Sequence, residues 1–145
     1  MKGSYEDMKK YFNIAFIYAI TAIASGVFYR EFTKFNDFTG KTSLSVTHLH
    51  LFVLGTIMFL VIALLVERTN LEEQKTFKTF IKLYNIGLPF MVIMFYVRGI
   101  VQVLRVELSK SANASISGIA GIAHIIMTIA IVMFFINLRK VEVKN

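Results

Sequence analysis

The chain has 145 residues, of which 56% are hydrophobic, and its mean hydropathy is +0.63. An ordinary soluble domain has about 45–50% apolar residues, so this composition argues against that class. The chain has no cysteine, which excludes disulfides, thiolate metal sites and covalent attachment of c-type haem. The net charge is +7, but the basic residues cluster at the ends of apolar runs, which argues against nucleic acid as a partner.

Four apolar runs follow one another along the chain, at residues 11–29, 44–66, 83–104 and 116–138. Each is close to the roughly 20 residues that an α-helix needs to cross a hydrocarbon core of about 30 Å. The first run is full-length and lacks a clear small-residue cleavage site, which is typical of a span rather than of a signal peptide. We therefore expect an all-α integral membrane four-helix bundle, with residues 1–145 as a single four-span domain in the lipid bilayer.

Lysine and arginine are distributed unequally between the two sides of the predicted spans. The side that holds both termini carries ten of these residues, and the opposite side carries five. Cytoplasmic loops of membrane proteins carry an excess of Lys and Arg. Both termini are therefore expected in the cytoplasm, and the expected location is a prokaryotic plasma membrane.

All three histidines of the chain lie in predicted spans, His48 and His50 in the second and His124 in the fourth. Imidazole is costly in hydrocarbon, so an intramembrane histidine indicates function, and it is a preferred axial ligand of haem iron. At 1.5 Å per residue, His50 lies about 9 Å and His124 about 12 Å from the outer ends of their spans. Arg98, in the third span, is again about 9 Å deep. These side chains are expected to share one layer in the outer leaflet.

Helical phase separates the two neighbouring histidines. Residues two apart on an α-helix point about 200° away from each other. His48 and His50 therefore cannot both bind one iron from the same helix, and they face two different compartments.

Small residues beside the histidines leave the kind of gap that a flat porphyrin needs. Gly121 precedes His124 by one turn, and Gly55 follows His48 by two turns. Arg98, and nearer the outer interface Arg105, are candidate partners for anionic haem propionates. The simpler explanations are that the glycines let helices pack closely and that Arg98 extends to the outer surface.

The segment 46–55, VTHLHLFVLG, resembles the His-x-His segment in the tenth helix of the catalytic subunit of haem-copper oxidases. It is also similar to the His-x-His segment of the NnrS-type haem membrane proteins. In the oxidases, one histidine binds the low-spin haem and the other binds the high-spin haem, on opposite faces of the helix. Over nearly its whole length, the chain resembles a family of uncharacterised small four-helix membrane proteins, a domain of unknown function.

The oxidase resemblance implies a mode of assembly. Twelve helices in three arcs of four form the oxidase subunit, so this chain would correspond to one arc and a homotrimer would rebuild the ring. Two ligand pairs stay open, namely His50 with His124 in one subunit, or His50 with a neighbouring subunit's His48. The chain lacks the adjacent histidine pair of the oxidase copper site, which argues against oxygen reduction and against an enzyme.

These features predict a protein that binds haem b through two histidines, with low-spin iron near the outer leaflet. Electron transfer, or redox or gas sensing, is the expected role, with a quinol or another redox partner. Copper fits the same three histidines less well than haem iron does. Two other functions stay open, a proton or metal-ion transporter or channel subunit that uses these histidines, and a structural or assembly protein without a cofactor.

Overall fold

The structure of the chain is a computed structural model that describes residues 2–144. The helices are α1 (Lys2–Phe35), α2 (Leu44–His50), α3 (Met58–Arg68), α4 (Phe77–Val103) and α5 (Lys110–Leu138). A π-helical segment, η1 (Leu51–Ile57), joins α2 to α3 without a break, and a short 3-10 helix, η2 (Leu71–Glu73), precedes α4. We call the continuous unit of α2, η1 and α3 the α2–α3 rod.

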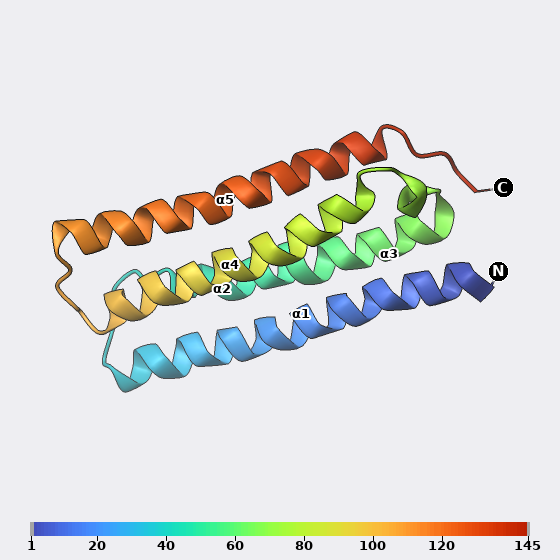
Figure 1. Cartoon of the computed structure of the whole chain (residues 1–145). Coiled ribbons are helices and arrows are strands. Elements are labelled where there is room, and N and C mark those ends of the chain that lie inside the picture. The colour runs from blue at the N-terminus through green and yellow to red at the C-terminus, as the bar shows by residue number, and fades with distance from the viewer. Residues whose placement is uncertain (1, 145) are drawn as a thin grey trace.

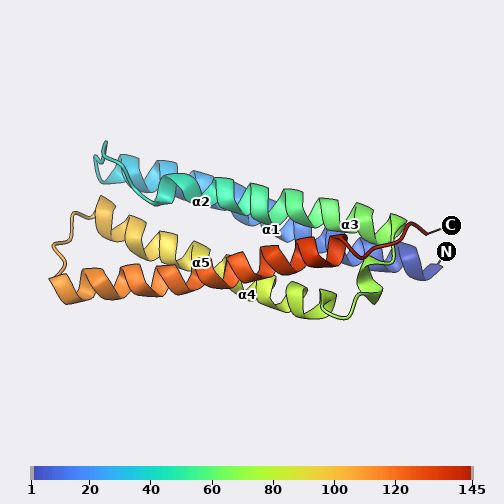
Figure 2. The same ribbon diagram turned by 90° about the horizontal axis from the view of Figure 1, so that it is seen from above.

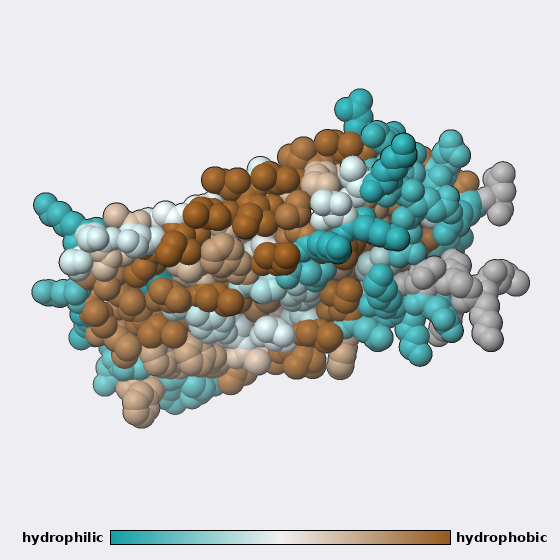
Figure 3. Space-filling view, in the orientation of Figure 1, coloured by the Kyte–Doolittle hydropathy of each residue, from teal (hydrophilic) through white to brown (hydrophobic). Residues whose placement is uncertain are grey.

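Four helical stretches are long and apolar enough to cross a membrane. They are Met8–Phe35, Leu44–Arg68, Phe77–Val103 and Lys110–Leu138. The third begins six residues before the predicted run and ends one residue before it, and the fourth also begins six residues early. Figure 3 shows a hydrophobic band across the middle of the molecule with hydrophilic side chains at both ends. The prediction of an all-α protein with four candidate membrane helices is confirmed.

The helices run alternately up and down, so that both termini lie at one end of the molecule (Figure 1). We call this end the termini end. The opposite end, which carries the loops 36–43 and 104–109, is called the far end. Helix α1 packs on the α2–α3 rod, and α4 packs on α2 and on α5. Helices α1 and α5 lie at opposite edges of the molecule in Figure 1, and Figure 2 shows α1 beside the α2–α3 rod and α5 beside α4. The result is an open arc of helices, in which α5 has one covered side.

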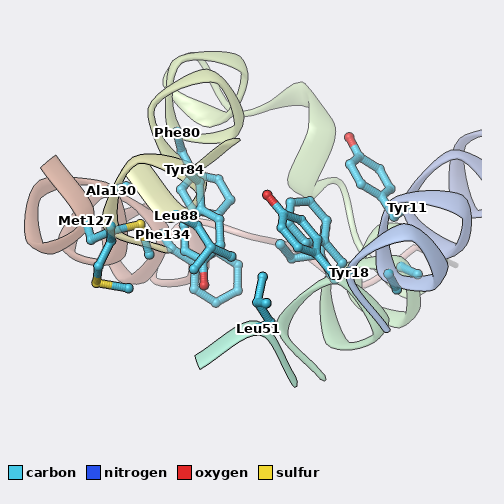
Figure 4. Packing of buried hydrophobic residues seen from close by; sticks show 14 of the residues in the cluster. Tyr11, Tyr18, Leu51, Phe80, Tyr84, Leu88, Met127, Ala130 and Phe134 are labelled. Carbon is cyan, nitrogen blue, oxygen red and sulfur yellow. The ribbon is translucent and has the colours of Figure 1, made fainter. Parts of the chain in front are cut away.

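An aromatic core holds α1, the α2–α3 rod and α4 together in the half nearer the termini end. Tyr18 stacks on Phe59 at 5.6 Å between ring centroids, and Phe59 meets Tyr84 edge-on at 5.8 Å. Phe80 continues the cluster to Phe134 of α5, at 5.1 Å. Figure 4 shows these rings filling the space between the helices. Since aromatic pairs add to the stabilisation from burial, this cluster anchors the helices whose far ends carry the histidines.

Candidate haem-binding site between α2, α4 and α5

The structure brings His50 and His124 to the same side chain. His50 of α2 lies edge-on to Phe95 of α4, with ring centroids 4.7 Å apart. His124 of α5 also lies edge-on to Phe95, at 5.9 Å. The two imidazoles thus flank one phenyl ring from two different helices, in the far-end half of the molecule. They share a layer, as their predicted depths require.

Both imidazoles are held by the backbone of their own helix. Nδ1 of His50 lies 2.8 Å from the carbonyl oxygen of Val46, and Nδ1 of His124 lies 2.8 Å from that of Ala120. A carbonyl only accepts, so Nδ1 carries the proton and donates in each pair. In the neutral ring Nε2 then has a free lone pair, which is the arrangement that metal-bound histidines commonly show.

Helix α2 is fixed on α4 at the residues that precede His50. The hydroxyl of Thr42 donates to the carbonyl oxygen of Gly99, at 3.1 Å. A Cβ added at Gly99 would lie 2.5 Å from Cγ of Leu44, so the two helices meet without room for a side chain. This contact sets the rotation of α2 against α4, and with it the approach of His50 to Phe95.

His48 faces the other neighbour of α2. Its Cβ and Cγ lie 3.8 Å from the position that a Cβ on Gly26 of α1 would take. Nδ1 of His48 is buried without a hydrogen-bond partner, and so is Oγ of Ser25 on α1. The two histidines of the His-x-His segment therefore point to different helices, in agreement with the phase argument.

The π-helical segment begins directly after His50 and has no clear signal in the sequence. A π-helix bonds i to i+5 instead of i to i+4, and such segments occur frequently at functional sites. The hydroxyl of Tyr84 on α4 donates to the carbonyl oxygen of Leu54, inside the segment, at 2.8 Å. This hydrogen bond stabilises η1 through a side chain of another helix, in addition to the backbone hydrogen bonds within η1.

The two glycines expected to leave room for a porphyrin have different surroundings. A Cβ added at Gly121 meets nothing within 4 Å, and the same holds for Gly118 one turn away. At Gly55 it would lie 2.5 Å from Cγ of Tyr18. The expectation for Gly55 is corrected, because the space beside it is filled by α1. At Gly121 the outer side of α5 is open next to His124, and the role of this glycine in cofactor binding stays a prediction.

Arg98 ties α4 to the beginning of α5. Its guanidinium donates to Oδ1 of Asn113, and to Oγ of Ser117 at 2.6 Å. Arg98 follows Phe95 by three residues, so it lies about one turn closer to the far end than the histidines do. Within residues 2–144, no carboxylate forms an ion pair with it. Its charge is compensated by neutral acceptors alone.

Arg105 lies in the turn after α4, away from the histidines. It has a left-handed backbone conformation with φ of 53°, and its guanidinium donates to the carbonyl oxygen of Asp37 at 3.3 Å. Arg105 and Arg98 nevertheless line the same open pocket of about 470 Å³, together with Lys110. The far end therefore presents three cationic side chains around one hollow.

The arrangement suits a cofactor that needs one or two protein ligands. In the part of the chain that the structure describes, no three His, Asp or Glu side chains come close enough to hold a bare metal ion. Haem iron needs only axial ligands, and free Nε2 atoms on His50 and His124 can serve. Gly121 and Gly118 leave one side of α5 open next to His124. For one iron to be held by both histidines, the ring of Phe95 has to turn aside.

The fold and its intramembrane histidines define a multi-pass α-helical membrane protein. The chain belongs to the family described as protein of unknown function DUF2871, whose model matches residues 8–141. Comparison with curated proteins found no match, and comparison with solved structures found none either. The likeness to haem-copper oxidases and to NnrS-type proteins therefore rests on the segment 46–55 alone.

Proposed function

We propose that this protein binds haem b in the membrane, with His50 and His124 as the two axial ligands. One observation carries the proposal. Two imidazoles from different helices flank Phe95, and each is held through Nδ1 by a backbone carbonyl so that Nε2 is free for iron. A histidine that only links helices would be expected to use its imidazole across the helix interface.

The pair His50 and His124 is favoured over the pair that uses a neighbour's His48. His48 packs on Gly26 of its own α1, and its Nδ1 has no acceptor to orient the ring. Ligation of one iron by both His50 and His124 requires the half-buried ring of Phe95 to leave its place beside the two imidazoles.

The far-end pocket fits the anionic edge of the same cofactor. Arg98 and Arg105 line it together with Lys110, about one to three turns beyond the histidine layer. Guanidinium groups form charge-assisted, bidentate bonds with carboxylates, so these two arginines would hold the haem propionates. The macrocycle would then lie along α5 beside Gly121.

Haem ligated by two histidines supplies one-electron redox chemistry. Because both axial positions are taken by protein, electron transfer or redox and gas sensing is favoured over catalysis. The protein would exchange electrons with a quinol or with another redox partner at the membrane. The histidines would hold the iron.

The placement in the membrane follows from charge. We infer a prokaryotic plasma membrane, the termini end in the cytoplasm and the haem towards the outer leaflet, because ten Lys and Arg residues flank the termini end. The open arc leaves the outer side of α1 and most of α5 without protein neighbours. A cyclic homotrimer would cover both edges, and closed cyclic assemblies are the common form of oligomer.

The test is the optical and electron paramagnetic resonance spectrum of the protein purified from haem-replete cells. We expect a Soret band, sharp alpha and beta bands on reduction, and a low-spin ferric signal. His50→Ala and His124→Ala should each lose the six-coordinate spectrum, whereas the matched variant His48→Ala should keep it.

Two results would contradict the proposal. A colourless protein that does not take up added haemin would exclude haem, and metal analysis would then separate a transporter from a structural protein. A full six-coordinate spectrum in His124→Ala would exclude the ligand pair but not the haem.

A further inference from the structure

The seam between α1 and α4 contains a basic pocket at the termini end. The pocket has a volume of about 500 Å³, and Lys10, Lys78 and Lys82 line it. All three lysines are exposed, and within the described residues none of them forms an ion pair with a carboxylate. Of the two acidic residues in the pocket, Glu72 accepts a hydrogen bond from the Tyr11 hydroxyl, and Glu73 is exposed. Lys10 lies over the Tyr11 ring, 5.1 Å from its centroid. Three lysines against two carboxylates leave one excess positive charge in the pocket, and Lys78 and Lys82 are the cations that no ion pair or ring contact engages among the described residues.

An apolar groove continues this seam towards the middle of the membrane. It begins one turn deeper on each helix, at Ile14 of α1 and Asn85 of α4, and has a volume of about 400 Å³. Helices α1 and α4 run in the same direction, so the groove follows both of them. From Lys82 to Ile93, at the deep end, eleven residues span about 16 Å, which is half of a hydrocarbon core of about 30 Å. Below Lys82, the groove is therefore about one leaflet deep.

The polar side chains that line the groove form hydrogen bonds within the protein. The Tyr18 hydroxyl donates to Oδ1 of Asn85 at 3.2 Å, and Nδ2 of Asn85 donates to the carbonyl oxygen of Ile81 at 2.9 Å. The hydroxyl of Thr21 donates to the carbonyl oxygen of Ile17 at 2.8 Å. Only the second N–H of the Asn85 amide has no acceptor among the described residues, so the groove offers a polar ligand a single donor. The groove is suited to a hydrocarbon chain.

We propose that the α1–α4 seam is a binding site for an anionic diacyl phospholipid. Lys10, Lys78 and Lys82 would hold the phosphate of the headgroup, and one acyl chain would lie in the groove between Ile14 and Ile93. Basic pockets between membrane helices bind anionic headgroups in this way. The site is separate from the histidines and does not depend on haem binding.

The test uses the full chain in nanodiscs of phosphatidylcholine that contain a minor share of phosphatidylglycerol. Native mass spectrometry counts the phosphatidylglycerol molecules retained. Lys78→Gln/Lys82→Gln should weaken retention by about fivefold for each lysine. The matched control is Lys9→Gln/Lys75→Gln, which removes two exposed charges at the same end but outside the pocket, and should retain the lipid.

Further variants and conditions in the same experiment distinguish binding of a lipid from binding of a free anion. Lys78→Arg/Lys82→Arg should retain phosphatidylglycerol, because the charge is kept. Ile93→Phe, which fills the deep end of the groove, should weaken retention although no charge changes. Inorganic phosphate in nanodiscs of pure phosphatidylcholine should leave the melting temperature unchanged. Equal retention by the Lys78→Gln/Lys82→Gln variant and its control, or stabilisation by phosphate alone, would overturn the proposal.

Discussion

Two regions of the arc each place a glycine near a histidine, but they are packed in opposite ways. On the α1 side, Gly55 lies against Tyr18, and half-buried His48 packs on the same helix. On the α5 side, Gly121 meets no atom and His124 is exposed. A small residue beside a histidine is therefore an indication of a cofactor only where no helix occupies the gap. The difference also assigns the open side as the place where a ligand or another copy can bind.

The largest effect on stability is expected from filling the gap on the closed side. Gly55→Ala places a Cβ within 2.7 Å of the Cβ of Tyr18, which is too close for either backbone to stay in place. Overpacking of this kind costs about 1–3 kcal/mol. The control Gly118→Ala meets open space and should raise stability by up to about 1 kcal/mol through helix propensity. Unfolding in detergent mixtures measures the stability of both variants. Equal stabilities would contradict the difference in packing between the two sides.

Filling the gap on the open side should lower cofactor content without lowering stability. Gly121→Leu adds a side chain where nothing lies within 4 Å, so the free energy of unfolding of the cofactor-free protein should rise by up to about 1 kcal/mol through helix propensity. Under the proposed function, haem binding should weaken about tenfold or more, since displacing the macrocycle costs about 1–3 kcal/mol. Titration with haemin measures the affinity. Unchanged affinity would place the macrocycle elsewhere.

The hydrogen bond that supports the π-helical segment should contribute a smaller amount. Tyr84→Phe removes the hydroxyl that donates to the carbonyl oxygen of Leu54, and we expect a loss of about 1 kcal/mol. Tyr96→Phe, on the same helix, is the control and should cost less. Thermal unfolding of both variants checks the difference. A Tyr84→Phe variant as stable as the control would mean that η1 does not need this partner.

The smallest effect is expected at His48, although this residue belongs to the most distinctive motif of the chain. Its buried Nδ1 has no partner, so His48→Leu removes an unsatisfied polar atom and keeps much of the volume. Such a change is close to neutral, or stabilising by up to about 1 kcal/mol. Denaturant titration measures stability, and a loss above 1 kcal/mol would show that the imidazole has a partner in solution.

Periodicity predicted which residues share a helix face, but it could not predict what covers that face. The separation of His48 from His50, and the common layer of His50 and His124, follow from 100° and 1.5 Å per residue and agree with the structure. The predicted placement of Gly55 on the same helix face as His48 also agrees with the structure. The residue that fills the space beside Gly55 is Tyr18 of α1, and no spacing in the sequence indicates this contact.

Three features of the candidate site depend on contacts between distant residues, which explains why the sequence did not show them. Phe95 between the imidazoles was one of many apolar side chains in its span. The bonds from Arg98 to Asn113 and Ser117 join two helices across a loop. The π-helical segment departs from the regular phase that the prediction assumed, and tertiary contacts such as that of Tyr84 support it.

The π-helical segment keeps the aim of both histidines on α2 unchanged across one extra residue in the α2–α3 rod. A π-helical turn accommodates one residue more than an α-helical turn, so η1 works as an insertion that the helix has absorbed. If the same residues formed a regular α-helix, the extra residue would turn α2 by about 100° against α3. Deleting one residue between 51 and 57 would instead let the rod become a regular α-helix that still presents His50 to α4 and α5. Related chains that are one residue shorter in this segment should therefore keep both histidines.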